Sequence, residues 1–221
     1  MSAVELRHEL PGGVTVLFTD RSHGSFALPA DPGDGTSAAE QRERVLTHTK
    51  ATALARGRQV HGSTVARATG KAPAREADGQ VTSLPDLALM VVSADCLPVA
   101  VGGEGAVAML HCGWRGLAAG VLEEGVRSVR ELAGPGPLWA LIGPGAGPCC
   151  YEVGPEVHEA LEVPRDQALL DLPGVARARL LAAGVADVGD VGLCTICDER
   201  FYSHRREGSR AGRQAGIAWL S

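Results

Sequence analysis

The stretch VVSADCLPVAVGGEGAVAMLHCGWRG, residues 91–116, contains two apolar runs with a glycine-rich segment between them. Both runs are short, rich in valine and bounded by turn-forming residues, which is typical of buried β-strands. The turn at Gly102–Gly105 allows the runs to pair as a hairpin or to lie close together in one sheet. Either arrangement brings Cys96 and His111 towards each other at strand ends. A thiolate and an imidazole in one place predict a site for a soft metal ion.

The composition is that of a folded domain without nucleic-acid or membrane chemistry. The chain has 221 residues, 45% of them hydrophobic, and a net charge of −5. This length predicts a single domain over residues 1–221 with a sizeable core. There is no basic stripe and aromatic residues are scarce, so nucleic acid is not an expected partner. No run approaches the roughly 20 apolar residues of a membrane span, so a membrane is not expected either.

The N-terminal segment and the cysteines together indicate a reducing compartment. The segment MSAVELRHELPGG carries charges and has no apolar signal core, so we expect a cytoplasmic protein. Six cysteines would permit three disulfides in a secreted chain. In the cytoplasm, free thiols or metal ligands are the expectation instead.

Helix and strand patterns alternate along the chain, which predicts a mixed α/β fold. Helices are expected at residues 38–55, 117–132, 155–161 and 172–183, and strands at residues 14–19, 58–66, 87–92, 139–142 and 217–220. If residues 58–66 are extended, Gln59 and His61 share one face, because side chains two positions apart do so in a strand.

His61, Cys96 and His111 form the strongest candidate site. Three ligands of the His₂Cys type leave one position of a tetrahedral zinc ion open, which is the pattern of a catalytic site rather than a closed structural one. The same set suits copper with a weak axial methionine, and Met109 would point to the same face as His111. The alternative is a buried apolar Cys96 with two unrelated histidines, because no short ligand spacing such as HExxH is present.

Two charged residues flank these candidate ligands. Asp95 precedes Cys96 and faces the other way in an extended strand, but a bend near Pro98 would let it orient a ligand or move a proton. Arg115 lies just before an expected helix N-terminus, where free N–H groups and a guanidinium favour a phosphate or carboxylate. The alternatives are a turn carboxylate at Asp95 and a surface arginine at position 115.

The remaining motifs are weaker indications. Cys149-Cys150 are neighbours that could be redox-active or simply buried thiols, and Cys194-x-x-Cys197 is a lone CxxC pair, which indicates zinc only weakly. The segment FYSHRR at residues 201–206 combines aromatic rings that could stack on a flat ligand with basic groups that could meet an anion. The alternative for that segment is a solvated basic surface.

Several motifs occur in one order along most of the chain: QVHG at 59–62, SADCLPV at 93–99, HCGWRG at 111–116, IGPGAGPCCYEVG at 142–154, CT at 194–195 and FYSHRR at 201–206. Together they resemble the laccase-domain family, also called the multicopper polyphenol oxidase-like family. The resemblance implies a single compact α/β domain with a mixed sheet and flanking helices. It also implies that His61, Cys96 and His111 are the metal ligands.

The resemblance further implies a zinc-dependent purine nucleoside enzyme. The implied reactions are phosphorolysis of adenosine, inosine, guanosine and methylthioadenosine, and deamination of adenosine. The partners would be a purine nucleoside and phosphate, and the protein a monomer or homodimer. We expect Asp95 to move protons and Arg115, with Arg42 as a second candidate, to bind phosphate. His204 lies in the segment expected to close over the base.

Two departures from the family pattern fall where substrate or phosphate contacts are expected. The Asn-Leu-Gly that the family carries after a phenylalanine is Ala27-Leu28-Pro29 here, and its Asn-Arg pair in the early helix is Gln41-Arg42. Three other functions stay open at this point. They are a copper-dependent phenol oxidase, an amidase that edits peptidoglycan precursors, and a binding module with a structural metal.

Overall fold

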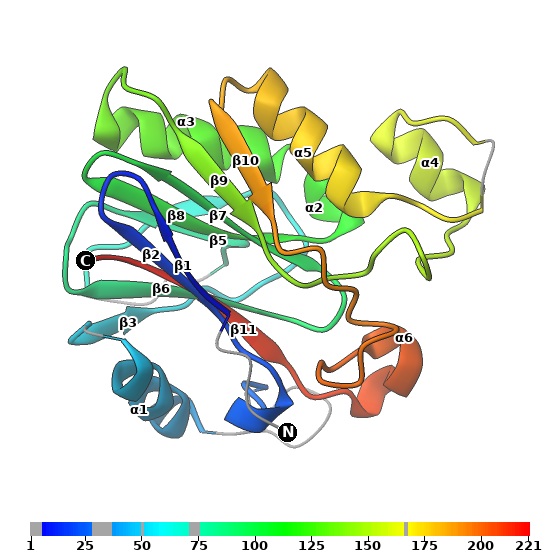
Figure 1. Cartoon of the computed structure of the whole chain (residues 1–221), viewed down its shortest axis with the longest axis horizontal. Coiled ribbons are helices and arrows are strands. Elements are labelled where there is room, and N and C mark those ends of the chain that lie inside the picture. The colour runs from blue at the N-terminus through cyan, green and yellow to red at the C-terminus, as the bar shows by residue number, and fades with distance from the viewer. Residues whose placement is uncertain (1–5, 28–36, 50, 71–75, 166–167) are drawn as a thin grey trace.

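Two β-sheets pack face to face, and helices cover their outer faces (Figure 1). The computed structural model describes residues 6–27, 37–49, 51–70, 76–165 and 168–221. The two sheets and their flanking helices confirm the expected α/β class, although a single mixed sheet was expected. The strands are β1 (Leu6–Leu10), β2 (Val14–Phe18), β3 (Ala53–Ala55), β4 (Val65–Arg67), β5 (Gly79–Thr82), β6 (Leu87–Ser93), β7 (Leu97–Gly103), β8 (Ala106–Cys112), β9 (Trp139–Ile142), β10 (Asp187–Asp190) and β11 (Gln214–Leu220). The helices are α1 (Ala38–His48), α2 (Trp114–Ala118), α3 (Val121–Ala133), α4 (Pro155–Leu161), α5 (Leu172–Ala182) and α6 (His204–Glu207).

The first sheet has the strand order β1-β2-β11-β6-β3 and the second the order β10-β9-β7-β8-β5-β4. In the first sheet only β3 and β6 run parallel. In the second sheet the outer pairs, β10 with β9 and β4 with β5, run parallel, and the central pairs run antiparallel. The chain passes from β6 in the first sheet to β7 in the second through residues 94–96, so the Asp95-Cys96 dipeptide lies where the sheets meet.

The hairpin expected within residues 91–116 is present as β7 and β8, with Leu97 opposite Cys112 and Pro98 opposite His111. Both faces of this hairpin are buried. Leu110 packs towards the helices, whereas Met109 packs between the two sheets. Strands buried on both faces have continuous apolar sequences rather than alternating ones, which explains the two apolar runs.

Three apolar clusters hold these layers together. The largest lies between the second sheet and helices α2 to α5, the second lies between the sheets, and the third joins the first sheet to α1. Figure 1 shows α1 on one outer side and α3, α5 and α4 on the other. Among the described residues, no helix combines the length and the apolar character needed to cross a membrane.

Three expected elements are wrong in their extent. The helix expected over residues 38–55 ends at His48, and Ala53–Ala55 instead pairs with β6, because tertiary pairing overrides helix propensity. The helix expected over 117–132 is interrupted at Gly120, whose φ of 88° separates α2 from α3. Of the strand expected over 58–66, only the end is extended, within β4. The other expected helices and strands are confirmed to within a few residues at their ends.

Candidate functional site

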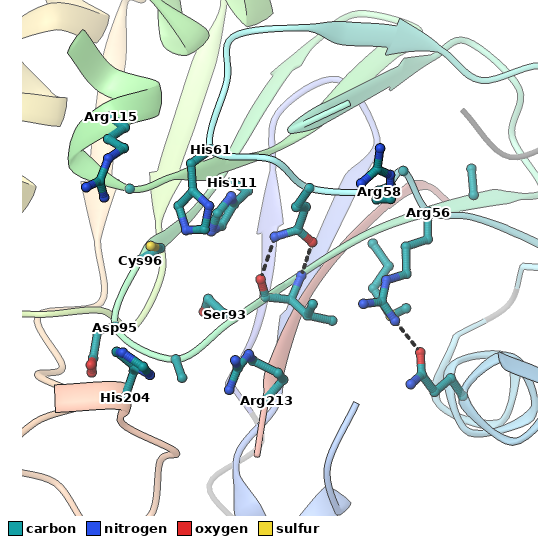
Figure 2. A pocket seen from close by; sticks show the side chains of 18 of the residues that line it. Arg56, Arg58, His61, Ser93, Asp95, Cys96, His111, Arg115, His204 and Arg213 are labelled. Carbon is teal, nitrogen blue, oxygen red and sulfur yellow. Dashed lines mark hydrogen bonds between the residues drawn. The ribbon is translucent and has the colours of Figure 1, made fainter. Parts of the chain in front are cut away.

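His61, Cys96 and His111 converge at one end of the two sheets (Figure 2). Their ligand atoms all lie within 4.8 Å of one another. The two imidazole rings are 4.9 Å apart between centroids, at an interplanar angle of 72°. His111 comes from the end of β8, Cys96 from the crossing between the sheets, and His61 from the loop before β4. The structure therefore brings together the candidate metal set from three separate segments.

The backbone is unusual at two of these positions. His61 has a φ of 61° and Asp95 a φ of 91°, although neither is glycine. Such conformations are disfavoured for residues with a Cβ atom and cluster at functional sites. The bend that the sequence allows at Asp95 is present, and it turns Cys96 towards His111. His61 does not lie on a strand, so the expected sharing of a strand face with Gln59 is wrong. Gln59 instead bonds the backbone of Val92 through both ends of its amide.

Asp78, which the sequence reading missed, explains the loop around His61. Its fully buried carboxylate accepts N–H bonds from Val60, His61 and Gly62 at 3.1, 2.9 and 2.8 Å. Its Oδ1 also lies 2.9 Å from Nδ1 of His111. A carboxylate that holds the second nitrogen of a histidine fixes the tautomer and the ring orientation. His111 Nε2 is thereby left to face Cys96. One aspartate thus positions two of the three candidate ligands.

The electrostatics of the set favour a thiolate. Burial raises the pKa of the Cys96 thiol, but the charge of His111 and hydrogen bonds from His111 and His61 outweigh it and lower the pKa to about 6. Burial lowers the pKa of His111, but the charge of Cys96 and the bond to Asp78 raise it to about 9. For Asp78, burial raises the pKa, yet bonds from His111, Gly62 and Val60 hold it below its usual value. A thiolate is the form of cysteine that binds a metal.

Two neighbouring residues define the space around the ligands. A Cβ atom at Gly113 would lie 2.7 Å from the Cys96 sulfur, so only glycine lets the chain pass this close. Cys112 points into the helix-side core, and burial raises the pKa of its thiol well above the usual value. Met109, the candidate axial ligand in the copper alternative, is fully buried in the core between the sheets. It is not among the residues that line the pocket.

The candidate ligands open into a cavity of about 1000 Å³. A cavity of this size accommodates a ligand of a few hundred daltons. The described residues that line it include six arginines, at positions 42, 56, 58, 115, 205 and 213, but one acidic residue, Asp95. Apolar and aromatic side chains, among them Met90, Val92, Trp114 and Tyr151, complete the walls. The cavity therefore suits a partly apolar ligand that carries, or reacts with, an anion.

The C-terminal segment contributes His204 and Arg205 to one wall of this cavity. Asp95 accepts a hydrogen bond from Thr195 Oγ1 and another from the Arg205 backbone N–H, both at 2.7 Å. His204 begins α6 and lines the cavity, and Figure 2 places it beside Asp95. Asp95 thus joins the crossing between the sheets to the segment that carries His204.

The two candidate phosphate-binding arginines lie at different places in the cavity. Arg115 is exposed on α2, with its guanidinium carbon 4.3 Å from the centre of the Trp114 ring. Figure 2 shows it above Cys96, on the side of the candidate metal ligands. Arg42 lies on α1, which packs at the end of the cavity marked by Arg56, and it donates a bond to the Thr52 carbonyl. Of the two arginines, Arg115 therefore lies nearer the candidate metal ligands.

Ala27 and Gln41, one described residue from each departure from the family pattern, are in contact. The buried Gln41 amide donates to the carbonyls of Phe26 and Ala27, at 2.7 and 2.8 Å, and accepts a bond from Arg56 at 2.6 Å. Leu28 and Pro29 lie outside the described residues. Ala27 and Gln41, the substituted positions that the structure describes, therefore belong to one contact at the α1 end of the cavity, away from the candidate metal ligands.

Ser93 is a further cavity residue that the sequence reading did not single out. Within the described part of the chain, its buried Oγ has no hydrogen-bond partner. Buried hydroxyls normally have a partner, so a polar group of a ligand is a natural one for this atom.

The sequence pattern of the family described as "Multi-copper polyphenol oxidoreductase laccase" matches residues 15–221. The chain belongs to this family. The laccase-family membership that the motifs indicated is therefore confirmed.

Two relatives of this chain carry the name purine nucleoside phosphorylase. A Pseudomonas aeruginosa protein named purine nucleoside phosphorylase is 38% identical over 234 residues, covering 95% of each chain. A Xylella fastidiosa protein of the same name is 42% identical over 188 residues, covering 74% of this chain and 70% of its own. The solved structure of a Neisseria meningitidis protein superposes with a TM-score of 0.81 at 28% identity, covering 98% of this chain and 99% of that one.

Proposed function

We propose that this protein is a zinc-dependent purine nucleoside phosphorylase that also deaminates adenosine. The observation that carries the proposal is the opening of a His₂Cys set into a cavity rich in arginine. A relative that matches nearly the whole chain and is named purine nucleoside phosphorylase supports the phosphorolysis part of the proposal.

The residues present fit a zinc ion. His61, Cys96 and His111 would hold it, since two imidazoles and a thiolate leave one tetrahedral position for a substrate or water. The Asp78 carboxylate bonds Nδ1 of His111, and metal-ligating histidines commonly make such a bond through their second ring nitrogen. When bound, zinc supplies Lewis-acid chemistry that polarises an oxygen and makes water nucleophilic near neutral pH. Copper with an axial methionine is less well supported, because Met109 is packed in the core.

The arginines supply the charge that phosphorolysis needs. In this reaction a phosphate oxygen forms a bond to the anomeric carbon while the glycosidic C–N bond breaks, and the purine leaves with the bonding electrons and takes up a proton. Arg115 would bind the phosphate from the ligand side of the cavity, because a guanidinium matches the geometry of phosphate oxygens. Holding both substrates together is itself a large part of the rate increase.

Asp95, His204 and the apolar walls would act on the nucleoside. Among the described residues that line the cavity, Asp95 is the one with a carboxylate. It would accept a proton from the substrate or return one to it. His204 lies beside it and would cover the base, with Tyr151 and Trp114 as flat apolar surfaces. The Ser93 hydroxyl would bond a polar edge of the nucleoside.

Product analysis separates the two reactions. Zinc-loaded protein incubated with adenosine and phosphate is expected to yield adenine, and without phosphate it is expected to yield inosine, both resolved by chromatography. Oxygen consumption with a phenol, and no product from adenosine, would support the oxidase instead. Amide hydrolysis in a peptidoglycan precursor without nucleoside turnover would support the amidase.

Replacing Arg115 with alanine is expected to raise the KM for phosphate about ten- to a hundredfold, since hydrogen bonds to charged groups contribute about 1.5–3 kcal/mol. The KM for the nucleoside should change much less. The measurement is initial rates across a phosphate series at saturating nucleoside. Arg127→Ala is the matched control, because Arg127 pairs with Glu124 and Glu131 on the surface of α3. An unchanged phosphate KM in Arg115→Ala would remove Arg115 from this role.

A further inference from the structure

Cys149, Cys150, Cys194 and Cys197 form a second cluster of metal-binding side chains. Their four sulfur atoms all lie within 4.8 Å of one another. We infer that this cluster is a second, structural zinc site with four thiolate ligands. The inference does not depend on the proposed function, because the cluster contains none of the residues that line the cavity.

The fold explains how the two cysteine pairs meet. Strands β9 and β10 are parallel neighbours, so the loops that follow them leave the sheet at the same end. The loop after β9 carries Cys149 and Cys150, and the loop after β10 carries Cys194 and Cys197. Backbone bonds join the loops, from Thr195 N–H to Gly145 O at 2.9 Å and from Gly145 N–H to Leu193 O at 3.2 Å.

The sulfur arrangement is that of ligands around a centre rather than that of disulfides. The Cys197 sulfur lies 3.1 Å from Cys149 Sγ and 2.9 Å from Cys150 Sγ, against about 2.0 Å in a disulfide. The Cys197 sulfur therefore lies at similar distances from two other sulfurs, whereas a disulfide joins a single pair. Four thiolates about 2.3 Å from a zinc ion stand about 3.8 Å apart at tetrahedral angles. The two distances from the Cys197 sulfur would have to grow by about 0.7–0.9 Å to reach that spacing, and all four sulfurs already lie within 4.8 Å of one another.

The backbone around the four cysteines donates a hydrogen bond to one sulfur and leaves space for the cysteine side chains. The Gly147 N–H points at the Cys194 sulfur at 3.3 Å. A Cβ atom at Gly147 would come within 3.0 Å of Cys194 Cβ and 3.6 Å of Cys149 Sγ, so the absence of a side chain allows this approach. Each cysteine pair sits in a turn, closed by Cys150 N–H to Gly147 O in one loop and by Asp198 N–H to Cys194 O in the other. Four thiolates in a tetrahedral set leave no open position, which is the pattern of a structural zinc site.

The site would hold the wall of the cavity in place. Tyr151 directly follows Cys150 and lines the cavity, and Thr195 directly follows Cys194 and bonds Asp95. A metal that ties the two loops together therefore fixes Tyr151 and Asp95 relative to each other. Its removal should loosen that wall while leaving the His₂Cys ligands in place.

The number of zinc ions bound per chain tests the inference. Protein loaded with zinc under reducing conditions and freed of excess metal is expected to contain two zinc ions per chain by mass spectrometry. Cys96→Ser should keep one, the double variant Cys149→Ser/Cys197→Ser should keep one, and the triple variant should keep none. The single-site variants thus separate a failure of this site from a failure of the cavity site. Cobalt substitution of Cys96→Ser should still give the intense thiolate-to-metal absorption of a four-sulfur site.

A measurement on the unmodified chain covers the case in which a variant does not fold. Cys149 and Cys197 are exposed, so iodoacetamide can reach their sulfur atoms unless a metal holds them. Hydrogen bonds to neighbouring sulfurs raise the pKa of both thiols to about 11, so the alkylation is run in an alkaline buffer, where a larger share of each is thiolate. Zinc loading is expected to slow alkylation of both by at least tenfold, as read by peptide mass spectrometry. Equal rates with and without zinc, or a zinc content that is the same in the unmodified protein and in Cys149→Ser/Cys197→Ser, would overturn the inference. A disulfide between any two of the four cysteines in protein that is isolated under reducing conditions would also overturn it.

Discussion

Replacing Cys96 with alanine is expected to remove the zinc of the His₂Cys site and to lower kcat/KM for nucleoside phosphorolysis at least about a thousandfold. Cys96 supplies the only thiolate of that set, and two imidazoles alone bind a metal far more weakly. The change is also small in volume, and Cys96 is only partly buried, so the fold should survive it.

The measurement combines metal content with initial rates on the same preparation. Cys112→Ala is the matched control, because Cys112 is a neighbouring cysteine whose side chain packs into the helix-side core. That control should keep its zinc and its rate within a few fold. Wild-type metal content and activity in a folded Cys96→Ala protein would rule out Cys96 as a ligand.

Replacing Asp78 with asparagine is expected to weaken zinc binding at the His₂Cys site and to lower activity by about ten- to a hundredfold. One Asp78 oxygen serves His61 N–H and His111, and the other serves the N–H groups of Val60 and Gly62. An asparagine amide has a single acceptor oxygen, so one of these two sets must face an NH₂ group. The free energy of unfolding should also fall by about 1–3 kcal/mol, because buried donors lose their partner.

Zinc affinity, measured by competition with a chelator, distinguishes this role from simple destabilisation. Asp171→Asn is the matched control, because Asp171 caps α5 by accepting the Gly174 N–H, and asparagine caps helices equally well. Asp171→Asn should leave zinc affinity unchanged. If Asp78→Asn bound zinc as tightly as the wild type, Asp78 would not position the ligands.

The hairpin and the set of candidate ligands could be predicted from the sequence because their signals are local or depend on several motifs together. The two apolar runs and their turn define β7 and β8, and that pairing places Cys96 beside His111. Helix ends were harder to predict. The helix after Ser37 stops at His48 because the following residues find a pairing partner in β6, which no local pattern reveals.

Asp78 and the four-cysteine cluster could not be predicted, for a different reason. Asp78 is an isolated acidic residue in the sequence, and its role depends on the loop of residues 60–62 folding around it. The two cysteine pairs are weak motifs when each is considered alone. Only the parallel pairing of β9 with β10, two strands far apart in the chain, brings them together.

The most direct test of the central claim is phosphorus NMR of inosine and phosphate incubated with metal-quantified, zinc-loaded protein. Inosine has no amino group at the base, so deamination cannot confuse the result. Zinc-dependent phosphorolysis predicts a ribose 1-phosphate signal that grows as the phosphate signal falls, and predicts no such signal with Cys96→Ala. An unchanged phosphate signal with folded, fully zinc-loaded wild-type protein would contradict the assignment of this site to purine nucleoside phosphorolysis.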